Sequence, residues 1–200
     1  MQTEIEVKWL NIDIDEMRRK LGDLGAELVQ PERIMVRRPY DFPDKRLEKI
    51  GGWVRVRKEG DKTTLCYKQL NDRTLHGTKE ITVVVDDFDV TCKFLEAIGL
   101  VSKSYQETKR ESWKLGEVEI ELDTWPWVLS FIEIEAPSEE KLRESAAKLN
   151  LDFSDALYGS VEPVYQAVYD VTEEEIDSWL EIRFVDIPDW LEIKRKANDR

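Results

Sequence analysis

The chain has 200 residues, of which 41% are hydrophobic, and its formal net charge is −13. This length and apolar content suffice for one globular domain and argue against wholesale disorder. The acidic charge argues against a nucleic-acid-binding protein, because such proteins need basic surface to displace counterions. A small basic site for a phosphorylated ligand remains compatible with this composition.

No apolar run is long enough to cross a bilayer, and the first residues show a strand pattern rather than a secretory signal. Cys66 and Cys92 lack the spacing of metal ligands, so we expect reduced thiols in a cytoplasmic protein. His76 is the single histidine and lies in a loop-like stretch, which disfavours a histidine-based triad. We therefore expect any catalysis to rest on carboxylates and metal ions.

Residues 4–8 read Glu-Ile-Glu-Val-Lys, an alternation typical of a β-strand. Successive side chains of a strand point to opposite faces, so Glu4, Glu6 and Lys8 share one face, and Ile5 and Val7 the other. Two carboxylates about 7 Å apart beside an ammonium suit a divalent metal bound together with an anion. Taken alone, the pentapeptide is equally a half-buried strand with a solvated charged face.

The first half of the chain predicts strands interrupted by two helices. Asp13 and Glu16 form the start signal of the first helix, and Gly25 is a suitable stop. In chain order the elements are a helix over 13–24, an extended segment over 27–37, an irregular stretch containing Pro39 and Pro43, a hairpin of 53–59 and 63–69 around Gly60-Asp61, a strand over 78–85 and a helix over 89–98.

The second half predicts three more strands, over 105–114, 117–123 and 131–135, followed by helices. Ser138 caps a third helix, and Thr172 with Glu175 forms a capping box for a fourth. Residues 186–200 are predicted to be a frayed, charged tail. We divide the chain into a main domain over 1–170 and a C-terminal helix and tail over 171–200.

The predicted strands group their charged residues by sign. Neighbouring like charges raise the energy of a sheet unless a ligand of opposite charge fills the space between them. A polyanion with bound cations would neutralise both groups, and a sheet closed into a barrel would give them a shared polar lumen. The basic group is Arg55, Arg57 and Lys68, and the acidic group is Glu119, Glu121, Asp123, Glu133 and Glu135.

These residues, in this order, resemble the signature of the CYTH family, also called triphosphate tunnel metalloenzymes. The resemblance covers roughly residues 3–170. It implies an α+β fold: an antiparallel eight-stranded barrel-like tunnel, with helices packed outside, that binds triphosphate with Mg²⁺ or Mn²⁺. The matching residues are Glu4-x-Glu6-x-Lys8, Arg55-x-Arg57, Lys68, Arg110, Glu121-x-Asp123 and Glu133-x-Glu135.

The resemblance also implies roles for individual residues. Metal ligands would be Glu4, Glu6, Asp123, Glu133 and Glu135, and phosphate-binding residues would be Lys8, Arg55, Arg57, Lys68 and Arg110. Glu4, Glu6, Lys8, Arg55 and Arg57 would be the catalytic residues, and Glu80 and Glu121 would line the tunnel.

Three segments depart from the family pattern. Thr82 stands where many relatives have another acid, and Tyr40-Asp41-Phe42 is an imperfect version of a segment common in the cyclase-like branch. Trp125-Pro126-Trp127 replaces the small turn expected after Asp123. We interpret these tryptophans as core or tunnel-end packing.

Four functions remain open from the sequence. The first is a metal-dependent phosphohydrolase acting on inorganic, nucleoside or thiamine triphosphate. The second is a class IV-type adenylyl cyclase, which would need a pocket for adenine and ribose. The others are a non-catalytic polyphosphate-binding module and a charged scaffold. The expected partner is a triphosphate-containing small molecule, not nucleic acid or membrane, bound by a monomer or homodimer.

Overall fold

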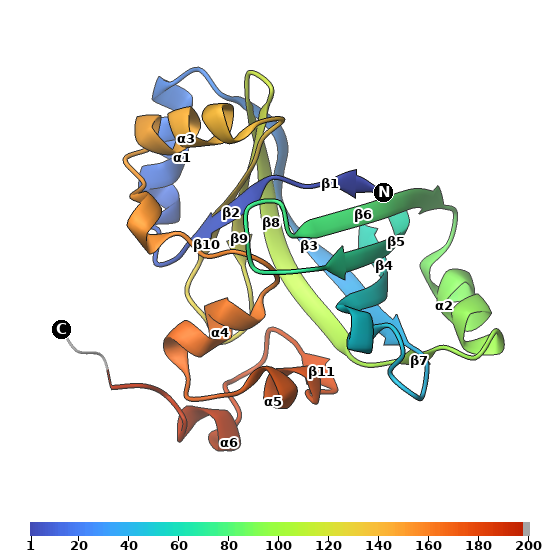
Figure 1. The fold of residues 1–200 in the computed structure, drawn as a ribbon. Coiled ribbons are helices and arrows are strands. Elements are labelled where there is room, and N and C mark those ends of the chain that lie inside the picture. The colour runs from blue at the N-terminus through green and yellow to red at the C-terminus, as the bar shows by residue number, and fades with distance from the viewer. Residues whose placement is uncertain (198–200) are drawn as a thin grey trace.

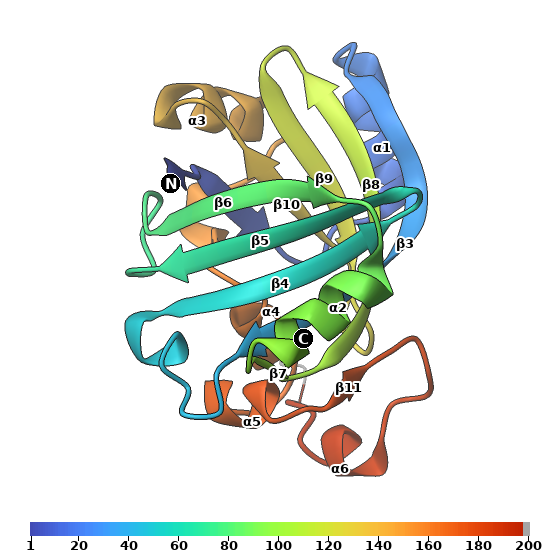
Figure 2. The same ribbon diagram turned by 90° about the vertical axis from the view of Figure 1, so that its right-hand side faces the viewer.

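The structure is a computed structural model that describes residues 1–197. Its centre is a strongly curled antiparallel sheet (Figures 1 and 2). The eight strands of four or more residues are β2 (Glu6–Trp9), β3 (Glu27–Asp41), β4 (Gly52–Glu59), β5 (Lys62–Leu70), β6 (Thr78–Val85), β8 (Tyr105–Leu115), β9 (Val118–Thr124) and β10 (Phe131–Glu135). The short strands are β1 (Gln2–Thr3), β7 (Val101–Ser102) and β11 (Glu181–Ile182).

The N-terminal segment joins the two edges of the curled sheet. The strand order is β1-β6-β5-β4-β3-β8-β9-β10-β2, so β1 and β2, which follow one another in the chain, lie at opposite ends of it. Between them, the Glu4 amide donates to the Thr78 carbonyl and the Ile5 carbonyl accepts from the Ala136 amide, both at 3.1 Å. The predicted eight-stranded, barrel-like α+β fold is confirmed.

Helices α1 (Ile14–Asp23) and α3 (Glu139–Lys148) cover the outside of β2, β9 and β10. Their apolar residues, among them the fully buried Leu21 and Leu142, pack against Ile120 and Ile134 of the sheet. Because strand residues alternate between faces, the acidic neighbours of these isoleucines point into the lumen. The strand pattern thus separates a dry outer core from a polar interior.

Two further cores hold the remaining helices. Helix α2 (Phe88–Ala97) packs Leu95 against Tyr40 and Val56 of β3 and β4. At one end of the sheet, α4 (Glu162–Val168), α5 (Glu173–Asp177) and α6 (Asp189–Glu192) surround a core that includes Trp125 and Tyr165 (Figures 1 and 2). Two 3-10 turns, Glu48–Ile50 and Phe153–Asp155, complete the fold. Within residues 1–197 no helix combines the length and apolarity needed to span a membrane.

The predicted helix starts are confirmed by side-chain caps. Asp13 accepts from the Glu16 amide at 2.9 Å, and Ser138 accepts from the Lys141 amide at 3.3 Å. Thr172 and Glu175 form the complete capping box of α5. Each cap satisfies backbone amides that lack a partner within the helix.

Two predictions about local structure were wrong, and one helix was missed. β3 continues through Pro39 to Asp41, because Pro39 lies where the pairing of β3 with β8 has ended at Arg37 and that with β7 has not yet begun. Helix α4 was not predicted. Residues 186–197 do not form a frayed tail, since Leu191 of α6 is fully buried; residues 198–200 lie outside the described part of the chain.

Candidate metal and phosphate site

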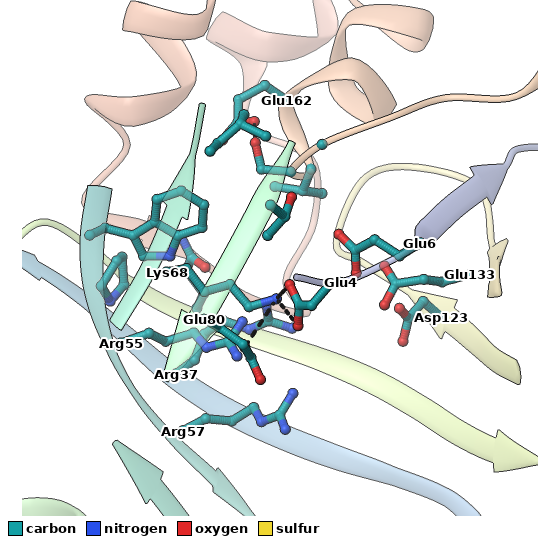
Figure 3. Close-up of a pocket in the computed structure, with 18 of the residues that line it drawn as sticks. Glu4, Glu6, Arg37, Arg55, Arg57, Lys68, Glu80, Asp123, Glu133 and Glu162 are labelled. Carbon is teal, nitrogen blue, oxygen red and sulfur yellow. Dashed lines mark hydrogen bonds and ion pairs between the residues drawn. The ribbon is translucent and has the colours of Figure 1, made fainter. Parts of the chain in front are cut away.

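The inward faces of the strands line a cavity of about 560 Å³. Carboxylates come mainly from β2, β9, β10 and the segment before β2, and arginines come from β3, β4 and β8. Figure 3 shows the two groups on different walls, with Arg55 and Arg57 apart from Glu6 and Glu133. All the site residues predicted from the sequence line this one cavity.

Three carboxylates form a cluster that suits a metal ion. One carboxylate oxygen from each of Glu4, Glu6 and Glu135 lies within 4.8 Å of the other two. The β2–β10 register makes Glu6 and Glu135 direct cross-strand partners. Carboxylate oxygens are the donors that Mg²⁺ and Mn²⁺ prefer, so this donor set fits the predicted cofactor.

Burial and mutual repulsion make the charged state of this cluster costly. Burial raises the pKa of Glu135 to about 8, and the nearby carboxylates of Glu4, Glu6 and Glu133 add to the shift. Burial also raises the pKa of Glu4 to about 7, although the Lys68 ammonium opposes this shift. A bound cation would remove the repulsion that holds these protons.

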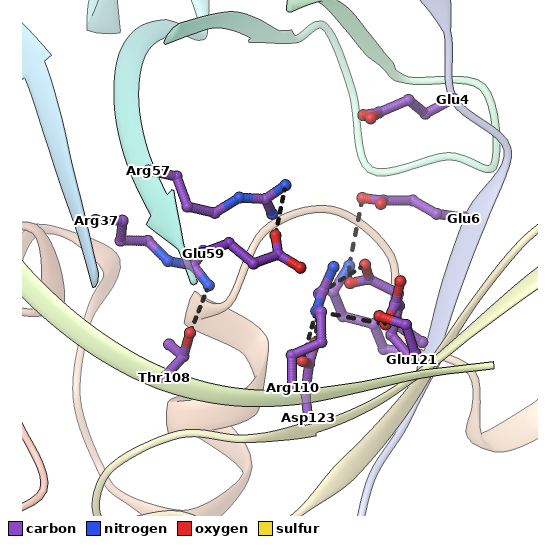
Figure 4. A network of polar contacts seen from close by, with 12 residues as sticks. Glu4, Glu6, Arg37, Arg57, Glu59, Thr108, Arg110, Glu121 and Asp123 are labelled. Carbon is purple, nitrogen blue, oxygen red and sulfur yellow. Dashed lines mark hydrogen bonds and ion pairs between the residues drawn. The ribbon is translucent and has the colours of Figure 1, made fainter. Parts of the chain in front are cut away.

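Asp123 and Glu133 lie outside this three-carboxylate cluster, in ion pairs. Arg110 donates to both oxygens of Asp123, at 2.7 and 2.5 Å, and to Glu133 at 3.2 Å (Figure 4). Burial alone would raise the pKa of Glu133, but Lys8 and Arg110 hold it far below its ordinary value. Glu121 accepts from Ser112 at 2.6 Å, and burial raises its pKa to about 7.

Both lysines bridge carboxylates across the cavity wall. The Lys8 ammonium lies 2.9 Å from Glu133 and 3.3 Å from Glu6, and it donates to the Gly159 carbonyl at 2.7 Å. Lys68 pairs with Glu4 at 2.8 Å and with Glu80 at 3.3 Å. The predicted phosphate-binding lysines are therefore already neutralised by acids.

The arginines of β3 and β4 are much less compensated. The buried Nε atoms of Arg37, Arg55 and Arg57 have no hydrogen-bond partner within the described residues. Burial, followed by repulsion from Arg55 and Arg110, lowers the pKa of Arg57 to about 10, and burial lowers that of Arg37 strongly. Among residues 1–197, Glu59 alone has a carboxylate oxygen within ion-pair distance of Arg57, at 3.5 Å. This wall is suited to an anionic ligand.

Arg37 and Glu162 are among the charged cavity residues that the sequence analysis missed. Arg37 lies on β3 beside Arg57, a place that depends on the pairing of β3 with β4. Glu162 at the start of α4 also lines the cavity, and burial raises its pKa. Trp125 packs as predicted, with only 5% of its surface exposed. Thr82, which replaces an acid of the family pattern, donates to Glu80 at 3.2 Å.

The sequence matches the CYTH domain over residues 2–162. The fold resembles PH1012 from Pyrococcus horikoshii OT3, with 21% identity, TM-score 0.68, and 80% of this chain and 98% of that chain covered. It also resembles a putative adenylate cyclase from Vibrio parahaemolyticus, with 18% identity, TM-score 0.72, and coverage of 82% and 98%. A third similar structure is HpAC1 from Hippeastrum, a putative adenylyl cyclase described as having a dominant triphosphatase activity.

The HpAC1 structure shares 13% identity at a TM-score of 0.56, covering 88% of this chain and 95% of that one. No curated protein sequence matches this chain. At these identities the structural likeness establishes the fold alone. The domain match spans most of the 200 residues and includes every one of the metal and phosphate positions described above. The chain therefore belongs to the CYTH family.

Proposed function

We propose that this protein is a metal-dependent phosphohydrolase that cleaves a linear triphosphate inside the tunnel. One observation carries the proposal: a single cavity has a carboxylate cluster on one wall and, on another, three arginines of which only Arg57 has an ion-pair partner among the described residues. A polyanion accompanied by divalent cations is the ligand class that neutralises both walls.

The metal would be held by Glu4, Glu6 and Glu135, with Asp123 and Glu133 beside them as further candidate ligands. When bound, Mg²⁺ or Mn²⁺ would neutralise phosphate charge and lower the pKa of an attacking water. The family resemblance supports this cofactor, and the cluster supplies oxygen donors only, as these hard cations require.

The basic residues would hold the phosphates and stabilise charge on the transferred group. Arg55 and Arg57 can each donate two hydrogen bonds to phosphate oxygens, while Lys8 and Lys68 would exchange part of their carboxylate contacts for phosphate. Water would then attack the terminal phosphorus and give a proton to the solvent, and the bridging bond would break. Orthophosphate would leave together with diphosphate from inorganic triphosphate, or with the nucleoside diphosphate from a nucleotide. Most catalysis of phosphoryl transfer comes from such positioning and charge stabilisation.

An adenylyl cyclase is the second candidate. Apolar side chains of Trp125, Val161 and Ile176 line part of the same cavity and offer a surface on which a nucleobase could pack. In this reaction the 3′-hydroxyl of ATP attacks the α-phosphorus and diphosphate leaves. We assign no polar side chain of the cavity to recognition of a nucleobase. We therefore expect the hydrolase to accept nucleotides with different bases.

A substrate panel with Mg²⁺ and Mn²⁺ tests the proposal, with orthophosphate, diphosphate and cyclic AMP measured separately. We expect orthophosphate from inorganic triphosphate and from several nucleoside triphosphates, and no product in excess chelator. Stoichiometric cyclic AMP and diphosphate from ATP, with inorganic triphosphate intact, would identify a cyclase instead. Binding of triphosphate without any product would identify a non-catalytic binding module.

A further inference from the structure

Arg37 is the most enclosed arginine of the basic wall, with only 8% of its surface exposed. Its guanidinium donates to the hydroxyl of Thr108 at 3.0 Å and lies over the Trp125 ring, 4.4 Å from the ring centroid (Figure 4 shows the Thr108 contact). Both partners are buried and neutral. They fix the orientation of the guanidinium without cancelling its charge.

No carboxylate compensates this buried cation. Within residues 1–197, neither Arg37 nor Arg55 has a carboxylate oxygen within the 4.0 Å of an ion pair, whereas Lys8, Arg57, Lys68 and Arg110 are each paired. Arg37 is instead the direct cross-strand partner of Arg57. Like charges placed opposite each other destabilise a sheet, and an unpaired buried charge costs more still.

Arg37 is not one of the residues that carry the resemblance to the family, whereas Arg55 and Arg57 are. Figure 3 shows Arg37 between Arg55 and Arg57, with its side chain directed into the same cavity. Its Nε atom is buried and without a hydrogen-bond partner among the described residues, like the Nε atoms of Arg55 and Arg57. The side chains of the buried Arg37 and of the partly buried Arg55 and Arg57 therefore lie in one part of the lumen.

We propose that Arg37, Arg55 and Arg57 together bind the free terminal phosphoryl group of the tunnel ligand. This inference rests on the proposed function and adds a specificity to it. A terminal phosphoryl group has three non-bridging oxygens and the higher negative charge, so it matches three guanidinium groups. An internal phosphoryl group has two such oxygens. The site accordingly selects linear polyphosphates with an unesterified end over those esterified at both ends.

Calorimetric binding in chelator tests this inference, because it separates the arginines from any bound metal. The probes are inorganic triphosphate and diadenosine triphosphate, whose two ends are both esterified. Arg37→Met should weaken inorganic triphosphate binding by about 10- to 100-fold, as expected for losing charged hydrogen bonds, and should change diadenosine triphosphate binding little. Arg38→Met is the matched control, since Arg38 is the next residue on β3, stacks on Tyr105 and does not line the cavity.

Thermal unfolding of the ligand-free protein distinguishes binding from a structural role. Removing an uncompensated buried charge should raise the melting temperature of Arg37→Met or leave it unchanged. A lower melting temperature together with equal loss of both probes would overturn the inference, as would unchanged triphosphate binding by this variant. Failure of the wild-type protein to bind inorganic triphosphate in chelator would overturn the inference alone, and failure to bind it with Mg²⁺ as well would also overturn the proposed function.

Discussion

The Lys68 ammonium donates to both carboxylate oxygens of Glu4, at 2.8 and 3.0 Å, although 64 residues separate the two in sequence. This pair connects β5 to the segment between β1 and β2, and it links the proposed phosphate site to the carboxylate cluster. A metal bound by Glu4 would release Lys68 for phosphate, and a phosphate on Lys68 would release Glu4 for metal. We therefore expect metal and triphosphate to strengthen each other's binding.

Glu4→Gln should lower turnover by at least about 100-fold, because it removes a candidate ligand of the metal. Circular dichroism should show an intact fold. Glu119→Gln is the control: Glu119 is exposed and is the cross-strand partner of Glu135, yet it lies outside the three-carboxylate cluster. Equal losses in turnover and Mn²⁺ affinity for the two variants would exclude the cluster as the metal site.

Arg55→Ala and Arg57→Ala should each weaken binding of inorganic triphosphate by about tenfold or more, because each removes charged hydrogen bonds to phosphate. Lys58→Ala should have little effect, since Lys58 follows Arg57 on β4 but is exposed and points away from the cavity. Titration calorimetry at fixed ionic strength measures all three. Similar small effects in all three variants would contradict the assignment of the two strand faces.

The metal-free protein should lose thermal stability as the pH rises from about 5 to about 8. The pKa of Glu135 is raised from 4.5 to about 8 and that of Glu4 to about 7, so in this range the folded state binds more protons than the unfolded chain. Their favourable contribution is complete below 4.5 and is lost as the pH passes the raised values. Melting curves in chelator should show this slope, and Glu135→Gln should flatten it. Stability that increases with pH in chelator would refute this account.

Leu191→Ala should lower the free energy of unfolding by about 2–5 kcal/mol, the usual cost of emptying a fully buried leucine site. Ile193→Ala is the matched control, since Ile193 is 83% exposed two residues further on. Denaturant unfolding measures both. Equal and small losses would show that α6 contributes nothing to the stability of the core around Tyr165 and Trp179.

The alternation of charged and apolar side chains was sufficient to predict most of the long strands and a set of charged residues that all line the cavity. Glu121 and Glu133, for example, point inward because Ile120 and Ile134 pack against α1 and α3. The pattern could not show which carboxylates meet, because that depends on register between distant strands. Pairing of Glu6 with Glu135, and of Arg110 with Asp123, follows only from the assembled sheet.

The sequence analysis failed where a local rule was overridden by distant packing. Pro39 indicated the end of an extended segment. At that point, however, one edge of β3 passes from pairing with β8 to pairing with β7, so residue 39 does not need a backbone N–H to hydrogen-bond to a neighbouring strand there. Arg37 lay inside the predicted segment, but its place opposite Arg57 depends on the pairing of β3 with β4. Two of the four residues 189–192 are acidic, yet Leu191 packs in a core formed with residues that precede it in the chain, such as Tyr165 and Trp179. Such contacts have no signature within a short window of sequence.

The carboxylate cluster joins residues from the two ends of the CYTH domain, so it can form only late in folding. Glu4 and Glu6 precede almost the whole CYTH domain, whereas Glu135 belongs to its last long strand. Contacts between such distant residues form slowly, because the entropy of closing the intervening loop opposes them. During synthesis β2 remains without its β10 partner until residues 131–135 have left the ribosome. A metal ion held by Glu4, Glu6 and Glu135 would therefore bind only after β10 has paired with β2, and it would stabilise the folded state in which these strands are paired.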